Sequence, residues 1–469
     1  MLVMTPSPAV PPPYTPPHPR PMGALPSLLR VLRHGDGNLL ELLPAEAYQF
    51  AVGNLGYSRR STVLFNDPVL VQQILRDADG VFPKSDLMVN ALEPLIGSSI
   101  FVTDGERWRR QRAMIDPAFS QLRIGLAFPA MQAAVADHIA TLRTHAETGQ
   151  NFSIDLAMSH LTADIICRTT FSTSLDSGVA HDVFEDFTEF ERSVAQVDIF
   201  RLIFQRAWAE VEQPASVLAA CQRIRGHLGT LVDSHLAPDA QFNDIASAVI
   251  AARDDASGEP FTRDELIDQL GVFFLAGHET SASVLTWVFY LLAEQPYWSD
   301  RLREEVDAVV GQGVIGFEHT RKLPLVKAFF RETLRLYPPI TFMPRVALEA
   351  TTIGPRKLKR GALVMISPWT LHRHSDYWQS PHAFQPERFL AANEAELHPG
   401  AYIPFGGGPH VCVGAGFAQT EAILIIASLV RAFDFKRADT EPVRPAARLT
   451  TRPAQQIQLH VACRSQGTS

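Results

Sequence analysis

Hydrophobic residues are most continuous between residues 262 and 293, where few charged side chains interrupt them. Thr262, with Glu265 three positions later, has the pattern of a capping box at the start of a helix. Pro296 marks the end, because proline cannot continue a helix. This run of about 33 residues would be roughly 50 Å long at 1.5 Å per residue. A helix this long and apolar on nearly all sides is expected to cross the middle of the molecule.

The rest of the pattern predicts more helices and only short strands. Apolar residues spaced by three or four positions predict helices at 121–145, 152–171, most of 182–236, 297–310, 324–337 and from about Gly414 onward. The stretch Val63–Leu75 indicates a strand end, a turn and a helix. Strand-like runs occur at 55–65, 340–368 and 445–462. The sequence therefore predicts a mainly α fold with a small β region (α+β), as a single helix-rich domain over residues 24–469.

Composition and charge narrow the class of protein. Residues 1–23 hold nine prolines and predict a semi-rigid tail before the domain. They contain no apolar stretch long enough for a signal peptide or membrane anchor. The net charge of −8 argues against nucleic-acid binding. Four scattered cysteines with no CxxC pair argue against a disulfide framework and a zinc site. We therefore expect a cytoplasmic protein without a membrane anchor or a nucleic-acid partner.

Two motifs suggest chemistry that their surroundings do not support. Gly311, Gly313 and Gly316 spell GxGxxG, but a charged helix precedes them where a dinucleotide site needs a strand. A surface loop is the better interpretation. His278-Glu279 begins the zinc-protease motif HExxH, but Ala282 stands where the second histidine belongs.

The segment FGGGPHVCVG (405–414) places glycines and a proline before a lone cysteine and a helix. It fails as a phosphate loop, because Val411 replaces the third glycine and no GK[ST] follows. As a nucleophile Cys412 would need a base, and His410 could serve only in an unusual loop geometry. As a metal ligand it is a soft thiolate at a helix N-terminus, where we expect a lowered pKa and N–H bonds to the sulfur. One thiolate cannot build a zinc or iron–sulfur site but suffices for haem, which is favoured.

This segment also fits a family signature. Phe405, Gly408, Cys412 and Gly414 match FxxGxxxCxG, and four further motifs occur in the expected order: WRRQR (108–112), AGHETS (276–281), ETLR (332–335) and PERF (386–389). From about residue 60 to its end, the chain closely resembles the cytochrome P-450 monooxygenases, the haem-thiolate enzymes. The resemblance implies the cytochrome P-450 fold, with the long central helix over haem b (iron protoporphyrin IX). Cys412 would be the axial ligand of the iron, with Phe405 and Gly414 beside the haem.

The same resemblance implies which side chains hold the haem propionates. Trp108 and Arg112 share one helix face at i and i+4, and Arg345 and His410 would be further donors. Many soluble bacterial members have histidine at the position of Trp108. The chain is therefore similar to a soluble bacterial-type member that carries eukaryote-like motifs.

The central helix carries the residues implied to activate dioxygen. Ala276-Gly277 would line a groove for a diatomic ligand, which would explain a glycine that costs about 1 kcal/mol against alanine in mid-helix. A Thr280 hydroxyl bonded to the i−4 carbonyl could open the helix locally. Glu279 and Thr280 are implied to relay protons, as the catalytic residues.

A second implied group is structural. Glu332 and Arg335 lie at i and i+3 and can pair, and the resemblance adds Arg388. Two buried cations around one carboxylate are costly unless fully hydrogen-bonded, so the expected role of the three is to fix the haem-side coil.

The expected substrate is an apolar small molecule, because the expected pocket walls are apolar. These walls are Ile100, Phe101, Phe273, Ala276, Ile340, Thr341, Phe342, the phenylalanine-rich 186–205 region and the Leu449-Thr450 hairpin with Thr450.

The resemblance further implies insertion of one oxygen atom from O2, with hydroxylation first among the possible reactions. No flavin or NAD module is present, so electrons would come from a ferredoxin or flavodoxin with its NAD(P)H-dependent reductase. Arg109 and Arg110 are expected to face solvent and to dock an acidic donor. The alternatives are a peroxide-using haem-thiolate enzyme, which would lack the acid–alcohol pair and have an arginine near that position, and a non-catalytic haem protein. The intact AGHETS segment argues against both.

Overall fold

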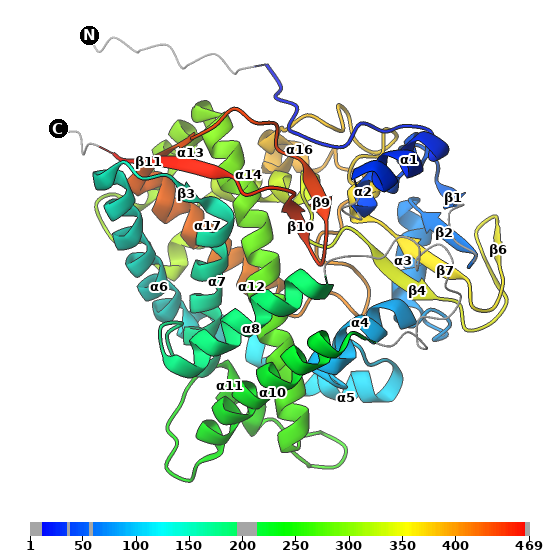
Figure 1. Ribbon diagram of the computed structural model, residues 1–469, viewed down its shortest axis with the longest axis horizontal. Helices are drawn as coiled ribbons and strands as arrows, with labels where there is room; N and C mark the ends of the chain where they lie inside the picture. The colour runs from blue at the N-terminus through cyan, green and yellow to red at the C-terminus, as the bar shows by residue number, and fades with distance from the viewer. Residues whose placement is uncertain (1–11, 35–37, 56–59, 195–212, 465–469) are drawn as a thin grey trace.

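The long apolar run in the middle of the chain forms helix α12, Arg263–Glu294. The Thr262 hydroxyl accepts from Glu265 N at 3.2 Å, and Thr262 N donates to the Glu265 carboxylate at 2.9 Å. The predicted capping box is therefore confirmed. In Figure 1, α12 runs through the centre of the molecule, as expected for a helix that is apolar on nearly all sides.

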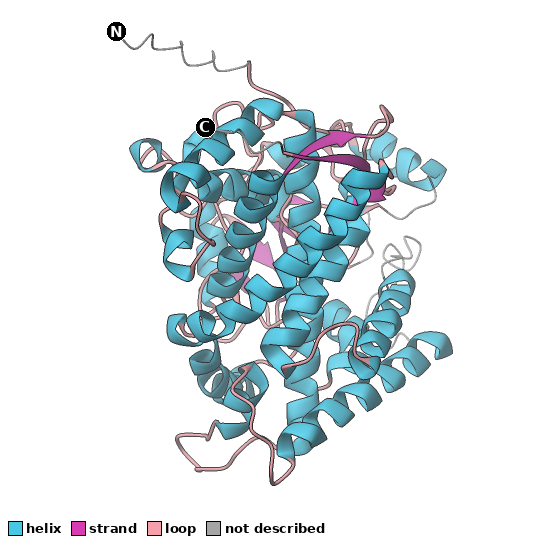
Figure 2. Cartoon of the chain, turned by 90° about the vertical axis from the view of Figure 1, so that its left-hand side faces the viewer, coloured by secondary structure: helices cyan, strands magenta, loops and turns pink. Residues whose placement is uncertain are grey.

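The structure, a computed structural model, describes residues 12–34, 38–55, 60–194 and 213–464. Helices form most of the molecule, with small patches of strand (Figure 2). Besides α12, the α-helices are α1 (Ala24–His34), α2 (Leu39–Leu42), α3 (Pro68–Arg76), α4 (Asp86–Ile96), α5 (Gly105–Ile115), α6 (Gln121–Thr148), α7 (Ile154–Phe171), α8 (Gly178–Val194), α10 (Ala215–Leu236), α11 (Ile245–Ala251), α13 (Pro296–Val310), α14 (Pro324–Leu336), α15 (Pro368–Leu371), α16 (Ala391–Glu394) and α17 (Ala415–Ala432). The strands are β1 (Val52–Asn54), β2 (Thr62–Phe65), β3 (Phe152–Ser153), β4 (Met343–Val346), β5 (Thr351–Ile353), β6 (Arg356–Leu358), β7 (Leu363–Ile366), β8 (Phe433–Arg437), β9 (Pro445–Ala447), β10 (Thr451–Pro453) and β11 (Gln458–Cys463).

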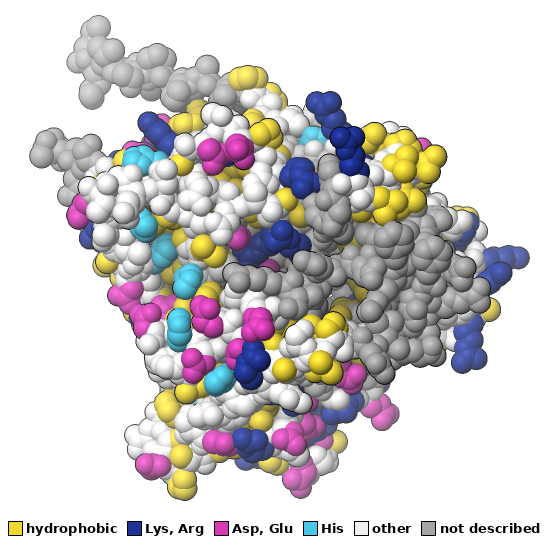
Figure 3. Space-filling model, in the orientation of Figure 1, with side chains coloured by type: hydrophobic (Ala, Val, Ile, Leu, Met, Phe, Trp, Pro, Cys, Tyr) yellow, Lys and Arg dark blue, Asp and Glu magenta, His cyan; other side chains and the backbone are white. Residues whose placement is uncertain are grey.

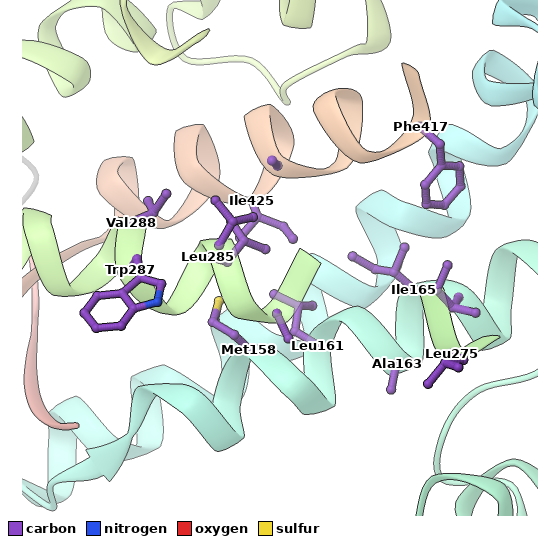
Figure 4. Packing of buried hydrophobic residues seen from close by; sticks show 14 of the residues in the cluster. Met158, Leu161, Ala163, Ile165, Leu275, Leu285, Trp287, Val288, Phe417 and Ile425 are labelled. Atoms are coloured by element: carbon purple, nitrogen blue, oxygen red, sulfur yellow. The ribbon is translucent and has the colours of Figure 1, made fainter. Parts of the chain in front are cut away.

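The core is built around α12, with α7 and α17 packed against it. Figure 4 shows Met158 and Leu161 of α7, Leu285 of α12 and Ile425 of α17 meeting between the three helices, and all four are buried. Burying a side chain of this size contributes about 1.5–3 kcal/mol relative to leaving it exposed. The helix that carries the AGHETS motif is therefore held in place by the largest apolar cluster in the fold.

A four-stranded sheet brings distant parts of the chain together on the other side of the molecule. Its order is β1-β2-β7-β4, with β2 and β7 parallel and the other pairs antiparallel. Strand β4 places Arg345 opposite Val364, and an isolated bridge joins Arg345 to Lys84. The sheet thereby sets two basic residues side by side.

The C-terminal hairpin of β9 and β10 lies against α12. Ser283 Oγ and Trp287 Nε1, both on α12, donate to the Thr451 carbonyl at 2.9 and 2.8 Å. This anchor fixes the backbone of β10 at the middle of the helix, so the neighbouring residues Thr450 and Arg452 also reach α12.

The predicted N-terminal tail does not project from the domain where it is described. Phe384 N donates to Tyr14 O at 2.8 Å, and the Tyr337 hydroxyl donates to Pro17 O at 2.7 Å. The Tyr14 hydroxyl lies 3.3 Å from that of Tyr290. The described part of the tail, residues 12–23, therefore packs against the domain through aromatic partners from segments far away in sequence.

Helices α17 and α1 differ in where their apolar side chains lie. Within the described residues, α17 alone is long and apolar enough to span a membrane by length and composition, and 61% of that window is buried inside the molecule. Helix α1 instead exposes Leu25, Leu29 and Leu32 on its outer face, at the upper right of Figure 3.

Most predicted elements are confirmed, with shifted ends. The stretch 182–236 contains two helices, α8 and α10; residues 195–212, including part of the predicted phenylalanine-rich wall, lie outside the described residues. The helix predicted from 152 begins at Ile154, because Phe152 and Ser153 pair with β11. The GxGxxG segment is a loop between α13 and a short 3₁₀ helix, Phe317–Arg321, as expected.

The predicted charge group joins α14 to the coil that follows residue 380. Both carboxylate oxygens of Glu332 accept from Arg335, each at 2.7 Å, and Oε1 also accepts from Gln385 N at 2.8 Å. Arg388 lies 3.6 Å from the same oxygen, and Arg335 donates onward to Ala383 O at 2.9 Å. Glu332 is fully buried, so its charge balances two guanidinium groups where water cannot.

Replacing Glu332 with glutamine should lower the free energy of unfolding by about 3–5 kcal/mol, because it leaves two guanidinium groups without their carboxylate. Urea unfolding of the haem-loaded protein, followed by circular dichroism, measures the change. Glu394→Gln is the matched control. Glu394 of α16 pairs at 2.6 Å with Arg331, which lies on α14 like Glu332, but the Glu394 side chain is 48% exposed. The expected loss of unfolding free energy is therefore about 0–1 kcal/mol. Equal effects of the two variants would contradict the assigned role.

Candidate functional site

The loop before α17 is shaped by glycines that no other residue could replace. Gly406 and Gly408 have φ angles of 76° and 64°, in the left-handed region that favours glycine. A Cβ on Gly408 would lie 2.3 Å from Leu75 O. Cys412 N donates to Phe405 O at 3.0 Å, which closes the loop and turns the cysteine toward the start of the helix.

The Cys412 side chain is exposed to solvent, although protein atoms closely surround it. Burial raises the pKa of its thiol, while the N–H of Gly414, which hydrogen-bonds the sulfur, and the charge of Arg112 lower it by less. The predicted N–H bond is present. The lowered pKa that we expect for Cys412 as a metal ligand stays a prediction.

A short stretch of α12 is accessible within an otherwise buried helix. From residue 266 to 292, every residue is buried except Ala276, Gly277 and Thr280. These three lie on one side, because positions i, i+1 and i+4 are neighbours on a helix surface. The Thr280 hydroxyl donates to Ala276 O at 2.6 Å, as predicted. This stretch therefore offers a hydroxyl and a strip of small residues to a bound molecule.

Gly277 has a second reason for lacking a side chain. A Cβ at this position would lie 2.4 Å from Ile166 Cδ1 of α7. A side chain at this position would therefore require the Ile166 side chain to move, and the predicted groove for a diatomic ligand is not the only explanation of the glycine.

The residues predicted to bind propionates converge near the cysteine loop. The Trp108 and His410 rings lie 3.9 Å apart between centroids. Arg112 donates to Val411 O at 2.6 Å and pairs with the exposed Asp116 at 2.5 Å. Arg112 thus holds the backbone of the loop directly.

Arg345, also expected to bind a propionate, is partly buried. Burial lowers the pKa of Arg345, and Asp104 and Asp77 offset only part of this effect. Its guanidinium donates to Pro344 O at 3.2 Å and, within the described residues, forms no ion pair. A buried, unpaired guanidinium is costly, so this group is suited to an anionic ligand.

Sequence reasoning missed Lys84, whose ammonium donates to Ile100 O at 2.9 Å and Thr103 O at 2.6 Å. Burial lowers the pKa of Lys84 to about 7, with Asp104 opposing and Arg345 adding to the shift. A lysine after Phe-Pro in a loop has no sequence signal of function, because its partners Ile100, Thr103, Asp104 and Arg345 come from other parts of the chain.

This basic cluster fits the carboxylates of the expected haem. Burial, followed by the charges of Lys84, Arg345 and Arg112, lowers the pKa of His410 to about 3. These three cations therefore lie close enough to His410 to disfavour a positive charge on its ring. Asp104, 3.8 Å from His410 Nε2, is one nearby carboxylate, and His410 Nδ1 is buried without a hydrogen-bond partner among the described residues. An accessible thiol near Arg345, whose guanidinium forms no ion pair among the described residues, suits a planar group that carries a metal at its centre and two carboxylates at its edge.

Glu279 turns toward the C-terminal hairpin. Arg452 binds both carboxylate oxygens, with Nε to Oε1 at 3.0 Å, and the Thr450 hydroxyl donates to Oε1 at 2.6 Å. Arg452 also pairs with Asp155 of α7 at 2.7 Å. The structure therefore does not join Glu279 directly to Thr280, and Arg452 was missed because nothing in the sequence links it to α12.

The predicted pocket walls divide into two groups. Five are partly accessible: Ile100, Phe101, Ala276, Ile340 and Phe342. Three are buried: Phe273, Thr341 and Thr450. Phe273 packs edge-on against Phe119 at 5.1 Å, and the Thr450 hydroxyl is bonded to Glu279. These two residues are therefore better explained by packing and by the charge group than by substrate contact.

A buried acid on α17 ties that helix to the accessible stretch of α12. Ser281, next to Thr280, donates to Glu421 Oε2 at 2.6 Å. Burial raises the pKa of Glu421 to about 8, and the bond from Ser281 offsets only part of the shift. Glu421 is therefore a neutral carboxylic acid at neutral pH.

Comparisons with known proteins agree on one family. A family model described as Cytochrome P450 matches residues 17–461. The chain is 30% identical to a cytokinin hydroxylase of Arabidopsis thaliana, covering 83% of this chain and 76% of that protein. It is also 30% identical to cyclooctat-9-en-7-ol 5-monooxygenase of Streptomyces melanosporofaciens, covering 84% and 82%. The fold matches the crystal structure of the cytochrome P450DA heme domain with a TM-score of 0.81 at 22% identity, covering 96% and 98%.

The buried acid makes stability depend on pH. The folded state keeps the Glu421 proton up to about pH 8, whereas the unfolded chain loses it near the ordinary pKa of about 4.3. Stability should therefore fall as pH rises through this window, by at most about 1.4 kcal/mol per pH unit, and level off above it. Glu421→Gln should remove this dependence. Chemical unfolding at several pH values measures it, with the exposed Glu396→Gln as control; parallel curves for wild type and E421Q would contradict a neutral Glu421.

Proposed function

Because the chain belongs to the cytochrome P450 family and is a haem b monooxygenase, we propose that it hydroxylates an apolar organic molecule beside the accessible stretch of α12. The observation that carries this proposal is the contrast within α12. Ala276, Gly277 and Thr280 are accessible while every other residue from 266 to 292 is buried. The bacterial relative is named for a monooxygenation of a cyclic alkenol, which supports an apolar, ring-containing substrate.

Haem b supplies dioxygen activation and transfer of one oxygen atom to the substrate. The Cys412 thiolate would hold the group, and the N–H of Gly414 would stabilise the charge on that sulfur. Arg112, Arg345, Lys84 and the Trp108–His410 pair are the residues that would hold the propionates. Each of these lies where burial makes an anionic partner favourable.

Thr280 and Glu279 are assigned to proton delivery. Because the Thr280 hydroxyl hydrogen is directed to Ala276 O, its oxygen is free to accept a hydrogen bond on the accessible side of α12. Glu279 is ionised and held by Arg452, so it can receive a proton once one is supplied. The apolar walls Ile100, Phe101 and Phe342 would exclude water from the substrate side.

The peroxide-using alternative gains no support from Arg452. This arginine lies beside the acid–alcohol pair, but its guanidinium is committed to Glu279 and Asp155. A substrate carboxylate would have to displace one of them.

We assign the supply of electrons to a separate protein, a ferredoxin or flavodoxin with its NAD(P)H-dependent reductase. The proposed location is the cytoplasm.

The proposed docking surface needs one correction. Arg109 is exposed, as predicted. Arg110 instead pairs with Glu265 at 2.8 Å and lies over the Phe261 ring at 5.4 Å. Of the two predicted arginines, Arg109 is therefore assigned to the donor protein and Arg110 to the start of α12.

Replacing Cys412 with histidine should abolish the absorption band of thiolate-ligated haem in the reduced, carbon monoxide-bound protein, because imidazole replaces the sulfur. Absorption spectroscopy of the haem-loaded variant measures this. Cys463→Ser, at the other exposed cysteine, is the control and should keep the band. A C412H variant that retains the thiolate band would place the ligand elsewhere.

Replacing Arg109 with glutamate should slow reduction by an acidic [2Fe–2S] ferredoxin about tenfold at low salt, because the charge that steers the encounter is reversed. Stopped-flow reduction over a range of salt concentrations measures the rate, and peroxide-driven turnover should stay unchanged. Arg110→Glu breaks the pair with Glu265 and should lower turnover by both routes. Salt-independent reduction of the wild-type protein would refute electrostatic docking.

A further inference from the structure

Ionisable side chains from four elements meet around Glu279. Glu191 of α8 lies 3.5 Å from His278 Nε2, and the ligand atoms of Glu191, His278 and Glu279 lie within 4.8 Å of one another. Asp155 and Ser159 of α7 and Arg452 of β10 complete the group; Thr450 adjoins it. Glu191, Asp155, Ser159 and Arg452 of this set carry no motif in the sequence.

Among the described residues, the carboxyl groups of this cluster outnumber its cations, so protonation of one acid reduces its net negative charge. Asp155, Glu191 and Glu279 supply three carboxyl groups, and among the described residues Arg452 supplies the one permanent positive charge. Burial lowers the pKa of His278, with Glu279 opposing this effect, so the imidazole is neutral. Three carboxylates beside one guanidinium would leave two net negative charges in a buried region, which is strongly unfavourable.

Geometry assigns the proton to Glu191. Arg452 contacts Glu279 and Asp155 directly, whereas Glu191 Oε1 is buried without a hydrogen-bond partner among the described residues. The neutral ring of His278 directs Nδ1–H to Phe274 O at 2.9 Å, so its Nε2 carries a lone pair toward Glu191. A protonated Glu191 can therefore donate either to His278 Nε2 or to the Glu279 carboxylate.

Electrostatics agrees with this assignment. Burial, followed by the charge of Glu279, raises the pKa of Glu191 well above its ordinary value. Burial also opposes the ionisation of Glu279, but Arg452 and then Thr450 hold the pKa of Glu279 below its ordinary value. At rest the proton lies on Glu191 and the charge lies on Glu279.

Glu191 is also the acid of this pair that reaches solvent. Its side chain is 21% exposed, against 6% for Glu279 and 3% for His278. A bound divalent cation is a poor alternative for this cluster, because the guanidinium of Arg452 already occupies both Glu279 oxygens and would repel it.

We propose that Glu191 is the outer proton donor that reloads Glu279 from solvent. This rests on the proposed role of Glu279 in proton delivery. In the transfer, the O–H bond of Glu191 breaks and an O–H bond forms on a Glu279 oxygen. Water then returns a proton to the Glu191 carboxylate, so no electron is gained or lost. Arg452 stays beside both carboxyl groups and limits the charge that develops during the transfer.

The test compares Glu191→Gln, which keeps the side-chain shape but cannot release a proton, with Glu189→Gln on the same helix, where Glu189 pairs with Arg223 and is 58% exposed. The first readout needs no turnover. Infrared spectra of the resting haem-loaded protein at pH 7 should show the C=O stretch of a protonated carboxyl that E191Q loses and E189Q keeps. Retention of the complete carboxyl signal in E191Q would overturn the assignment of the proton.

The second readout is the coupling of electron consumption to product. E191Q should lower the coupled rate at least about tenfold, increase the solvent deuterium isotope effect and change the pH profile, while Glu191→Asp restores part of the rate. Thr280→Ala distinguishes an error in the role of Glu191 from an error in the proposed proton delivery by Glu279 and Thr280. If T280A uncouples the enzyme and E191Q does not, the role of Glu191 is wrong; if neither variant does, the proposed proton delivery itself is wrong.

Discussion

The structure depends on one constraint: α12 is buried on all sides over most of its length, so each polar group on it needs a partner from another part of the chain. Water cannot supply these partners, and an unpaired buried polar group costs about 1–3 kcal/mol. Asp268 accepts from Ser98 N at 2.9 Å and pairs with Arg225. Ser281 meets Glu421 and Glu279 meets Arg452. The helix therefore organises the elements around it.

This constraint explains why the functional groups come from distant segments. The loop at 98–103 is held to α12 through Asp268 and to Lys84 through two carbonyl groups. Lys84 is in turn bridged to Arg345 of β4. Polar contacts to α12 thus extend to the basic cluster beside Cys412, and the position of the cofactor is linked to the packing of the core.

The two clusters of ionisable side chains, one near Cys412 and one around Glu279, differ in the charge of the side chain that lacks a direct partner. Near Cys412, Arg345 forms no ion pair among the described residues, which suits this cluster to a ligand that brings negative charge. The cluster around Glu279 has more carboxyl groups than cations, which favours holding a proton on Glu191. One arrangement favours binding of an anionic cofactor and the other favours proton storage, and in both the cause is a largely buried ionisable group without a direct partner of opposite charge.

The sequence by itself determined the elements and motifs whose physics is local. The capping box of α12, the helix ends at prolines, the glycine-rich loop before Cys412 and the i,i+3 pair of Glu332 and Arg335 all follow from short-range spacing, and their geometry is present in the structure. Membership of the family was also evident from the motifs.

Only the tertiary structure decided the contacts between segments far apart in sequence. Arg452, Lys84 and Glu191 carry no local signal, Arg110 binds Glu265 rather than solvent, and Gly277 is explained partly by Ile166. Spacing along a chain reports which side chains share a face, but burial and charge balance depend on every element that packs against that face.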